Sequence, residues 1–484
     1  MPMLQVDCLI AEPRKRLQWR ILLPIGLGIL MTSFESSAVV SILPRIGDAF
    51  HGNIYVAKWV VTLHALTMCT LLLAAGRLGD LFGHCRLYLM GLAMSFMGAF
   101  MCSIAASIGE LAFFRIVSGI GAVLVFANAA ALLTKLSAST MRGYMLGLLS
   151  TAAYLGLILG PAMSGFLSSS FGWQAIFIAV MVLAAIAFVL GLYNLPNDGR
   201  SNTIKNVNIL ETLLIALALG AFVLAFHSGR LGWQSLSVIS LLGTAFLAII
   251  VIVLKNRINV GSNGYITVLV NPKIALAIVM ATFSYIALYS INFAMPFYLS
   301  GRQSLNSAII GLILSVRPAA TAIIAPLSGK LTDRFGSYFF NTLGILILLL
   351  AFILLALVFG QPETGWTILS LAGIGAGMGI FLPPNHNIIM STALPTERGV
   401  ASAILSLSRN LGMLIGVGIG SSFFSIKSDR HVYGVGSSNP ALHSVFLISA
   451  WIASISVFII AIQGIVNFIK KRKMPLFVSG DSKA

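Results

Sequence analysis

The sequence predicts an all-α membrane protein whose chain crosses the bilayer fourteen times as helices. Of its 484 residues, 58% are hydrophobic and only 9% are charged, whereas a soluble domain carries about 25% charged residues. Long apolar runs alternate with short polar segments, and one motif recurs at matching places in the two halves of the chain. Lipid is therefore the solvent that most of the side chains require.

The apolar runs give the expected helices. A helix needs about 20 mostly apolar residues to span a bilayer, and fourteen runs meet this requirement. The first of them follows a polar tail and is longer than the apolar core of a signal peptide, so we expect it to remain as the first span. The runs cover residues 20–43, 55–75, 86–107, 110–133, 143–167, 172–195, 207–227, 234–254, 273–299, 306–328, 337–360, 364–385, 399–425 and 441–468.

Charge predicts the orientation. An even number of spans places both termini on one side of the membrane. With both termini in the cytoplasm, the inner segments contain 21 Lys and Arg residues and the outer loops contain 6. This excess follows the positive-inside rule, and we expect a multi-pass protein of the bacterial inner (plasma) membrane with both termini cytoplasmic. The expected parts are a tail over 1–19, six helices over 20–195, two linker helices over 207–254, six helices over 273–468 and a tail over 469–484.

Composition also excludes several classes of protein. The net charge of +17 would suit nucleic acid, but the basic residues are spread over short loops rather than over one face. The four cysteines form no CxxC motif or Cys/His cluster, so we expect no metal and no cofactor. No loop is long enough for a catalytic or nucleotide-binding domain, and GxxxxGK[ST] is absent, which excludes an ATP-driven pump.

The recurring motif is G-[basic]-L-x-D-x-F-G. It covers residues 76–83 and 329–336, which lie 253 residues apart, and both copies are expected in inner loops. Such repeats are characteristic of secondary transporters. The Asp of each copy can meet a helix N-terminus or a nearby Arg, and these contacts can form in one conformation and break in another. The candidate gating residues are Gly76, Asp80, Gly83, Arg86, Gly329, Asp333, Arg334 and Gly336.

Glu35 is the only one of thirteen acids that lies deep in an apolar run. Burial disfavours the charged form of a carboxylate, so such a group can take up a proton near neutral pH. At about 1.5 Å per residue, Glu35, His64 and Arg115 all lie roughly 9–14 Å below the outer boundary. We predict that these three form one proton-coupling cluster. The structural alternatives are a permanent ion pair for Glu35 and a hydrogen-bonded core histidine for His64.

The second half carries two arginines near the middle of helices, Arg317 and Arg409. A charge at this depth almost always faces protein or a water-filled cavity. The functional interpretation is attraction of an anionic or carbonyl-bearing substrate, and the structural one is hydrogen bonding to carbonyls at helix kinks. The candidate residues of a substrate cavity are Glu35, Asn128, Asn292, Arg317, Arg409 and Asn410.

Several motifs resemble the major facilitator superfamily, and in particular its fourteen-helix drug:proton antiporter branch. The loop signature resembles residues 76–86, and the antiporter motif GxxxGPxxGG resembles Gly156, Gly160, Pro161 and Gly165, with Ser164 in place of one glycine. Further matches are Arg115 with Gly119, Gly121 and Ala122, and Arg409 with Asn410 and Gly412. The resemblance implies two six-helix bundles, two extra central helices, and export of amphipathic or lipophilic compounds in exchange for protons.

The resemblance also favours organic cations as substrates. It implies that the partners are a small-molecule substrate, protons and the lipid bilayer, and that the protein is a monomer. The sequence departs from the family pattern at Glu35, where Asp is usual, and at His64, where Tyr is usual. Two alternatives remain open. One is a proton-coupled symporter or an exporter of an anionic or neutral metabolite, and the other is a non-transporting membrane scaffold or receptor, for which a buried charge has no evident use.

Overall fold

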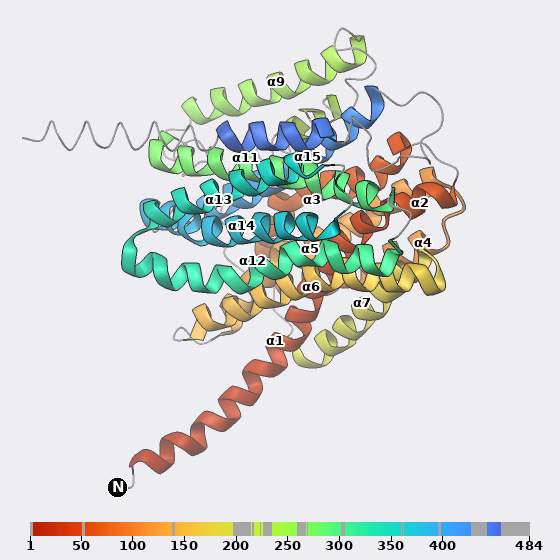
Figure 1. Cartoon of the computed structure of the whole chain (residues 1–484). Coiled ribbons are helices and arrows are strands. Elements are labelled where there is room, and N and C mark those ends of the chain that lie inside the picture. Colours follow the sequence, from red (N-terminus) through yellow and green to blue (C-terminus); the bar gives the residue numbers. More distant parts are fainter. Residues whose placement is uncertain are drawn as a thin grey trace, which may run out of the picture.

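The computed structural model is a bundle of long helices (Figure 1). It describes residues 3–50, 54–137, 141–196, 214, 217–222, 224–225, 235–258, 268, 270–301, 305–359, 361, 363–394, 398–426 and 443–455. All the regular structure in these residues is helical. The expected all-α class is therefore confirmed for the part of the chain that is described.

The first half contains the six expected long helices and one short one. Helix α1 begins far outside the bundle, where its first turns project from the rest of the molecule (Figure 1). It continues without interruption into an apolar span that begins at Trp19. The elements are α1 (Met3–Ser41), α2 (Leu43–Ala49), α3 (Ile54–Phe82), α4 (His84–Ser103), α5 (Ile108–Leu136), α6 (Arg142–Phe171) and α7 (Gln174–Asn194).

The second half follows the same order of helices. Its elements are α11 (Pro272–Ser300), α12 (Ser307–Phe335), α13 (Ser337–Leu357), α14 (Thr364–Thr392) and α15 (Arg398–Ile426), and a further helix covers His443–Ile455. Between the halves lies α9 (Leu236–Ile258). The run expected over 207–227 lies largely outside the described residues, as does the end of the run over 441–468. Ten described helices are long and apolar enough to span a membrane, so the count of fourteen stays a prediction.

The two halves pack their helices in the same way. Helix α4 packs on α5, α3 on α5 and α1 on α6, and the same three pairings recur as α13 on α14, α12 on α14 and α11 on α15. The internal repeat inferred from one loop motif therefore extends over the packing of both bundles. The two bundles also contact each other through two equivalent helix pairs. Helix α6 packs on α12, and α3 packs on α15.

Glycines produce the closest of these contacts. A Cβ at Gly156 would lie 2.8 Å from the Cβ of Ser33 on α1, and one at Gly416 would lie 2.6 Å from the carbonyl oxygen of Ile286 on α11. The glycine pair of α6, Gly156 and Gly160, has its counterpart 256 residues later in Gly412 and Gly416 of α15. Small residues at this spacing let helix backbones approach closely, which explains this part of the antiporter motif structurally.

The later part of the motif lies where the two bundles meet. A Cβ at Gly311 of α12 would be 3.1 Å from the Cα of Gly165 on α6. Close by, the Ser315 hydroxyl donates a hydrogen bond to the carbonyl oxygen of Ile158 at 3.0 Å. Gly165 therefore contributes to the interface between bundles, whereas Gly156 and Gly160 hold α6 against α1.

The position of the repeated motif corrects one expectation. Both copies were placed in loops, but α3 continues to Phe82 and α12 continues to Phe335. Each connection is a single glycine at positive φ, Gly83 at 99° and Gly336 at 90°. Only glycine adopts this conformation without strain. The final glycine of the motif therefore ends one helix and begins the next, and the Asp and basic residues lie on the last helical turns.

Candidate functional site

The centre of the first bundle contains a buried ion pair. Glu35 of α1 is 0% exposed and Arg115 of α5 is 1% exposed, and an Nη of Arg115 donates to Oε1 of Glu35. The Ser118 hydroxyl, one turn further along α5, donates to the same oxygen. The Nε of Arg115 donates to the carbonyl oxygen of Val60 on α3 at 3.1 Å. Three helices are thus joined through one carboxylate and one guanidinium.

Two groups in this cluster lack side-chain partners. Oε2 of Glu35 is buried and has no hydrogen-bond partner among the described residues. Neither ring nitrogen of His64 on α3 has a side-chain partner among the described residues, and the ring lies beside the backbone of Arg115. Buried polar atoms are nearly always paired in folded proteins. Oxygen and nitrogen atoms without side-chain partners next to a buried ion pair are therefore chemically suited to take up and release protons.

The structure brings Glu35 and Arg115 into contact and places His64 beside them. Their role in proton coupling stays a prediction. Sequence analysis missed Ser118 as a partner of Glu35, although its spacing from Arg115 gives a signal, because residues three apart share one face of a helix. Cys102 of α4 also lies within electrostatic range of the pair, so four helices surround it.

The carboxylate does not face the space between the bundles. That space contains a small cavity lined by Ser37 and Ser41 of α1, by Pro161 of α6, and by Asn292 and Arg317 of the second bundle, with Val40, Pro296 and Leu314. Glu35 is absent from the lining and has no exposed surface. The same helix therefore presents its acid to the interior of its own bundle and its two serines to the cavity.

Among the predicted cavity residues, Asn292 and Arg317 line the cavity together. Arg409 reaches across the bundle interface, where its guanidinium lies 4.9 Å from the ring centroid of Phe126 on α5. Asn410 is buried, and its Nδ2 has no hydrogen-bond partner in the described part of the chain.

Asn128 does not line this cavity, and neither do Arg409 and Asn410. Asn128 lies inside the first bundle instead. Its side chain is 0% exposed, and its Nδ2 donates to the carbonyl oxygen of Leu124 at 2.8 Å. Its Oδ1 lies 2.8 Å from Nδ1 of His84. An asparagine inside an apolar helix satisfies its amide with the nearest backbone and side-chain groups, so this one joins α5 to the first residue of α4.

Asp80, one of the candidate gating residues, contacts His84, which sequence analysis missed. Nε2 of His84 lies 3.2 Å from Oδ1 of Asp80, one turn earlier. Arg86 was expected near Asp80, but it is exposed and has no ion pair with a described residue. In the second copy, Arg334 is exposed, and the side chain of Asp333 lies outside the described part of the structure. The Asp80–His84–Asn128 series joins α3, α4 and α5 at the end of the bundle where α3 ends and α4 begins.

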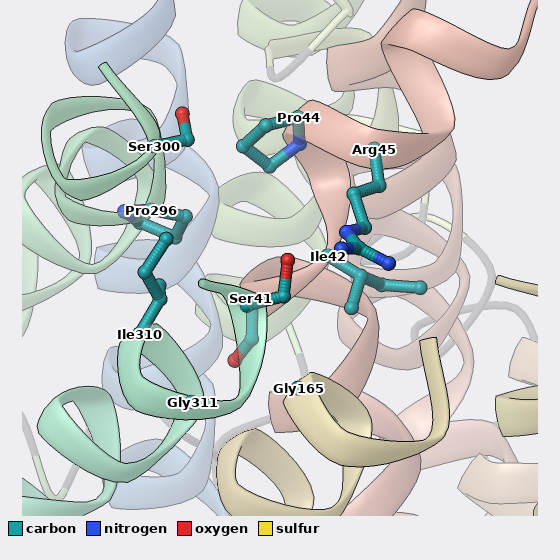
Figure 2. Close-up of a pocket in the computed structure, with 10 residues that line it drawn as sticks. Ser41, Ile42, Pro44, Arg45, Gly165, Pro296, Ser300, Ile310 and Gly311 are labelled. Atoms are coloured by element: carbon teal, nitrogen blue, oxygen red, sulfur yellow. The ribbon is translucent and has the colours of Figure 1, made fainter. Parts of the chain in front are cut away.

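A second small pocket opens between the two bundles, near the C-terminal ends of α1 and α11. Figure 2 shows Ser41, Pro44 and Arg45 from the first bundle opposite Pro296 and Ser300 from the second. The guanidinium of Arg45 donates to the carbonyl oxygen of Ser168 on α6. In the residues that the structure describes, no group of three His, Cys, Asp or Glu side chains could hold a metal ion.

Comparison with known proteins agrees with this architecture. The model of the Major Facilitator Superfamily matches residues 25–417 and 275–476. The riboflavin transporter RibZ of Clostridioides difficile is 26% identical over 450 residues, which cover 91% of this chain and 96% of the relative. The multidrug resistance protein Stp of Mycobacterium tuberculosis is 29% identical over 408 residues, covering 84% and 75%. The methylenomycin A resistance protein of Bacillus subtilis is 28% identical over 410 residues, covering 82% and 86%.

Proposed function

We propose that this chain, which belongs to the Major Facilitator Superfamily, exports small amphipathic or lipophilic compounds in exchange for protons by alternating access. The observation that carries the proposal is the state of Glu35. Its carboxylate is fully buried, and one oxygen accepts from Arg115 and Ser118 while the other has no described partner. A buried acid among spanning helices is a functional group by default.

Protonation of Glu35 changes how α1 is held. When the carboxylate is charged, it attracts the guanidinium of Arg115 in a site of low dielectric constant, where such attraction is strong. Uptake of a proton removes this attraction and leaves Arg115 without its anion, which disfavours the present arrangement of α1 and α5. Helix α1 also lines the cavity through Ser37 and Ser41. A shift of this helix therefore couples the proton site to the substrate cavity.

The remaining motifs act on the same movement. The glycine contacts of α6 with α1 and of α15 with α11 present smooth helix faces, along which helices can slide or rock. The Asp80–His84 contact joins the inner ends of α3 and α4, and it is a gating contact if it forms in only one conformation. The chain would work as a monomer in the bacterial inner membrane, with fourteen spans and both termini cytoplasmic.

The names of the relatives support transport of small molecules, and some support export. Stp is named a multidrug resistance protein, and a further relative from Streptomyces glaucescens is named a tetracenomycin C resistance and export protein. RibZ is named a riboflavin transporter, which leaves proton-driven import as the alternative. All of these relatives are named for transport or resistance, which fits a protein that is not an enzyme.

The test uses the purified protein in liposomes that enclose a pH-sensitive dye. An amphipathic dye is added outside under an imposed pH gradient, and the internal pH is recorded. For an exchanger, entry of the dye releases protons from the lumen, so the internal pH rises. A symporter would lower the internal pH together with dye uptake. No movement of protons in response to any added compound would overturn proton coupling.

A further inference from the structure

Two arginines in the second bundle lack the counter-charge that Arg115 has. Arg317 of α12 and Arg409 of α15 are half-buried near the middle of their helices. Arg115 pairs with Glu35, but neither Arg317 nor Arg409 forms an ion pair with a described carboxylate. A guanidinium held at this depth without an anion is costly.

The internal repeat shows that this imbalance is specific to the second half. A Cβ at Gly119 would lie 3.2 Å from the carbonyl oxygen of His64, and a Cβ at Gly375 would meet the carbonyl oxygen of Arg317 in the same way. Arg317 therefore occupies the place of His64. In the first half, His64 is 1% exposed beside the paired Arg115, whereas Arg317 lines the open cavity with Asn292.

The acid has no counterpart in the second half. The contacts of Gly156 with α1 and of Gly412 with α11 match residues that are 252 apart, which places Ala287 at the position of Glu35. The second half therefore keeps a cation facing the cavity and lacks the carboxylate that would neutralise it. An anion that enters the cavity would supply the missing charge.

Aromatic side chains from both bundles surround the two arginines. Tyr154 of α6 lies within electrostatic range of both Arg317 and Arg409. On α11, Tyr285 lies near Arg409 and Tyr289 lies near Arg317. The ring centroids of these two tyrosines are 6.4 Å apart. Phenolic hydroxyl groups can donate to an anionic oxygen, and aromatic faces can stack on a planar ligand. The guanidinium of Arg409 makes a cation–π contact with the ring of Phe126.

We propose that the cavity between the bundles binds a small aromatic anion, such as an aromatic carboxylate, with Arg317 of the lining on its charged group. Arg409, Tyr154, Tyr285 and Tyr289, which lie near Arg317 and one another, adjoin this site. This inference names the substrate class of the proposed exporter and rests on that function. An organic cation would face the like charge of Arg317 in the cavity lining, and Glu35 could not offset it because Glu35 is engaged by Arg115. Like charges placed together in such a site are unfavourable.

The test compares two dyes that share a xanthene ring and differ in charge, anionic fluorescein and cationic rhodamine 123. Binding to the full-length protein in detergent is measured by fluorescence anisotropy without any gradient. Fluorescein is expected to bind, and Arg317→Gln to weaken it by about 10- to 100-fold, since charge-assisted hydrogen bonds have this strength. Lys273→Gln, which removes an exposed positive charge from the start of α11, is the matched control and should leave binding unchanged.

Arg317→Lys checks that the loss reflects charge rather than misfolding, because it keeps the charge and should retain part of the affinity. The proposal is overturned if fluorescein binding does not depend on Arg317, or if rhodamine 123 is the tighter ligand of the unmodified protein. Transport is measured separately in liposomes with a pH gradient. Arg317-dependent binding without gradient-driven transport would refute proton exchange and leave the anion site intact. Gradient-driven transport of rhodamine 123 but not of fluorescein would support proton exchange and refute the anion site.

Discussion

Replacement of Arg115 by glutamine removes the cation that contacts Glu35. Removal of one partner from a buried ion pair costs about 3–5 kcal/mol, because the remaining charge stays buried. Arg115 also loses its hydrogen bond to Val60, which is worth about 1 kcal/mol. After the change, Glu35 keeps the Ser118 hydroxyl as its described donor. We therefore expect Arg115→Gln to destabilise the protein by about 4–6 kcal/mol.

A double-mutant cycle separates the ion pair from the rest of the site. Glu35→Gln alone leaves Arg115 without its anion, but the double variant Glu35→Gln/Arg115→Gln contains two neutral amides that can bond to each other. A buried ion pair replaced as a whole is often tolerated. We expect the double variant to recover at least about 2 kcal/mol relative to the sum of the single changes.

The assay is the temperature at which purified protein in detergent loses its monodisperse elution on size exclusion. The double variant should elute intact up to a higher temperature than Arg115→Gln. If instead the effects of the two single changes add, the residues are not coupled, and the buried pair seen in the structure does not hold the first bundle together.

Three further changes test other parts of the structure. Gly336→Ala should lower the stability of the protein by about 1–2 kcal/mol, because a residue with a Cβ is strained at positive φ. Gly147→Ala, at an open helical position, should be neutral or mildly stabilising in the same thermal assay. Gly416→Ala should lower the stability of the protein by about 1–3 kcal/mol through overpacking, and it should also slow transport. Gly243→Ala, with open space around the glycine, should change neither stability nor transport. Equal effects of the two variants would refute the proposed close contact. His84→Gln should alter the transport rate more than the thermal stability if the inner contact is a gate, and unchanged kinetics would make that contact purely structural.

Hydropathy was sufficient to predict the long helices that the structure describes and their order along the chain, because a spanning helix must be long and apolar whatever it packs against. It could not predict where α3 and α12 end. The Asp and basic residues of the repeated motif resemble a loop in composition, yet the backbone stays helical until a glycine allows positive φ. Helix ends in polar surroundings are set by such local conformations rather than by hydropathy.

The proton site was partly predictable for a similar reason. Helix rise converts sequence position into depth, so Glu35, His64 and Arg115 could be placed at one level before any contact was known. Depth does not give the rotation of each helix about its axis. The contact of Asn128 with His84 depends on that rotation and on the neighbouring helix, and so does the position of the tyrosines near Arg317. Sequence analysis therefore assigned Asn128 to the cavity and missed the tyrosines.

The most direct test of proton exchange measures Glu35→Gln in liposomes in two modes, gradient-driven accumulation of substrate and exchange of labelled for unlabelled substrate without a gradient. The amide keeps the size of the side chain but cannot take up and release the proton. We predict that accumulation is abolished and that gradient-free exchange persists, whereas Glu110→Gln, at an exposed acid of α5, retains both. Accumulation by Glu35→Gln at the level of the unmodified protein would contradict the account.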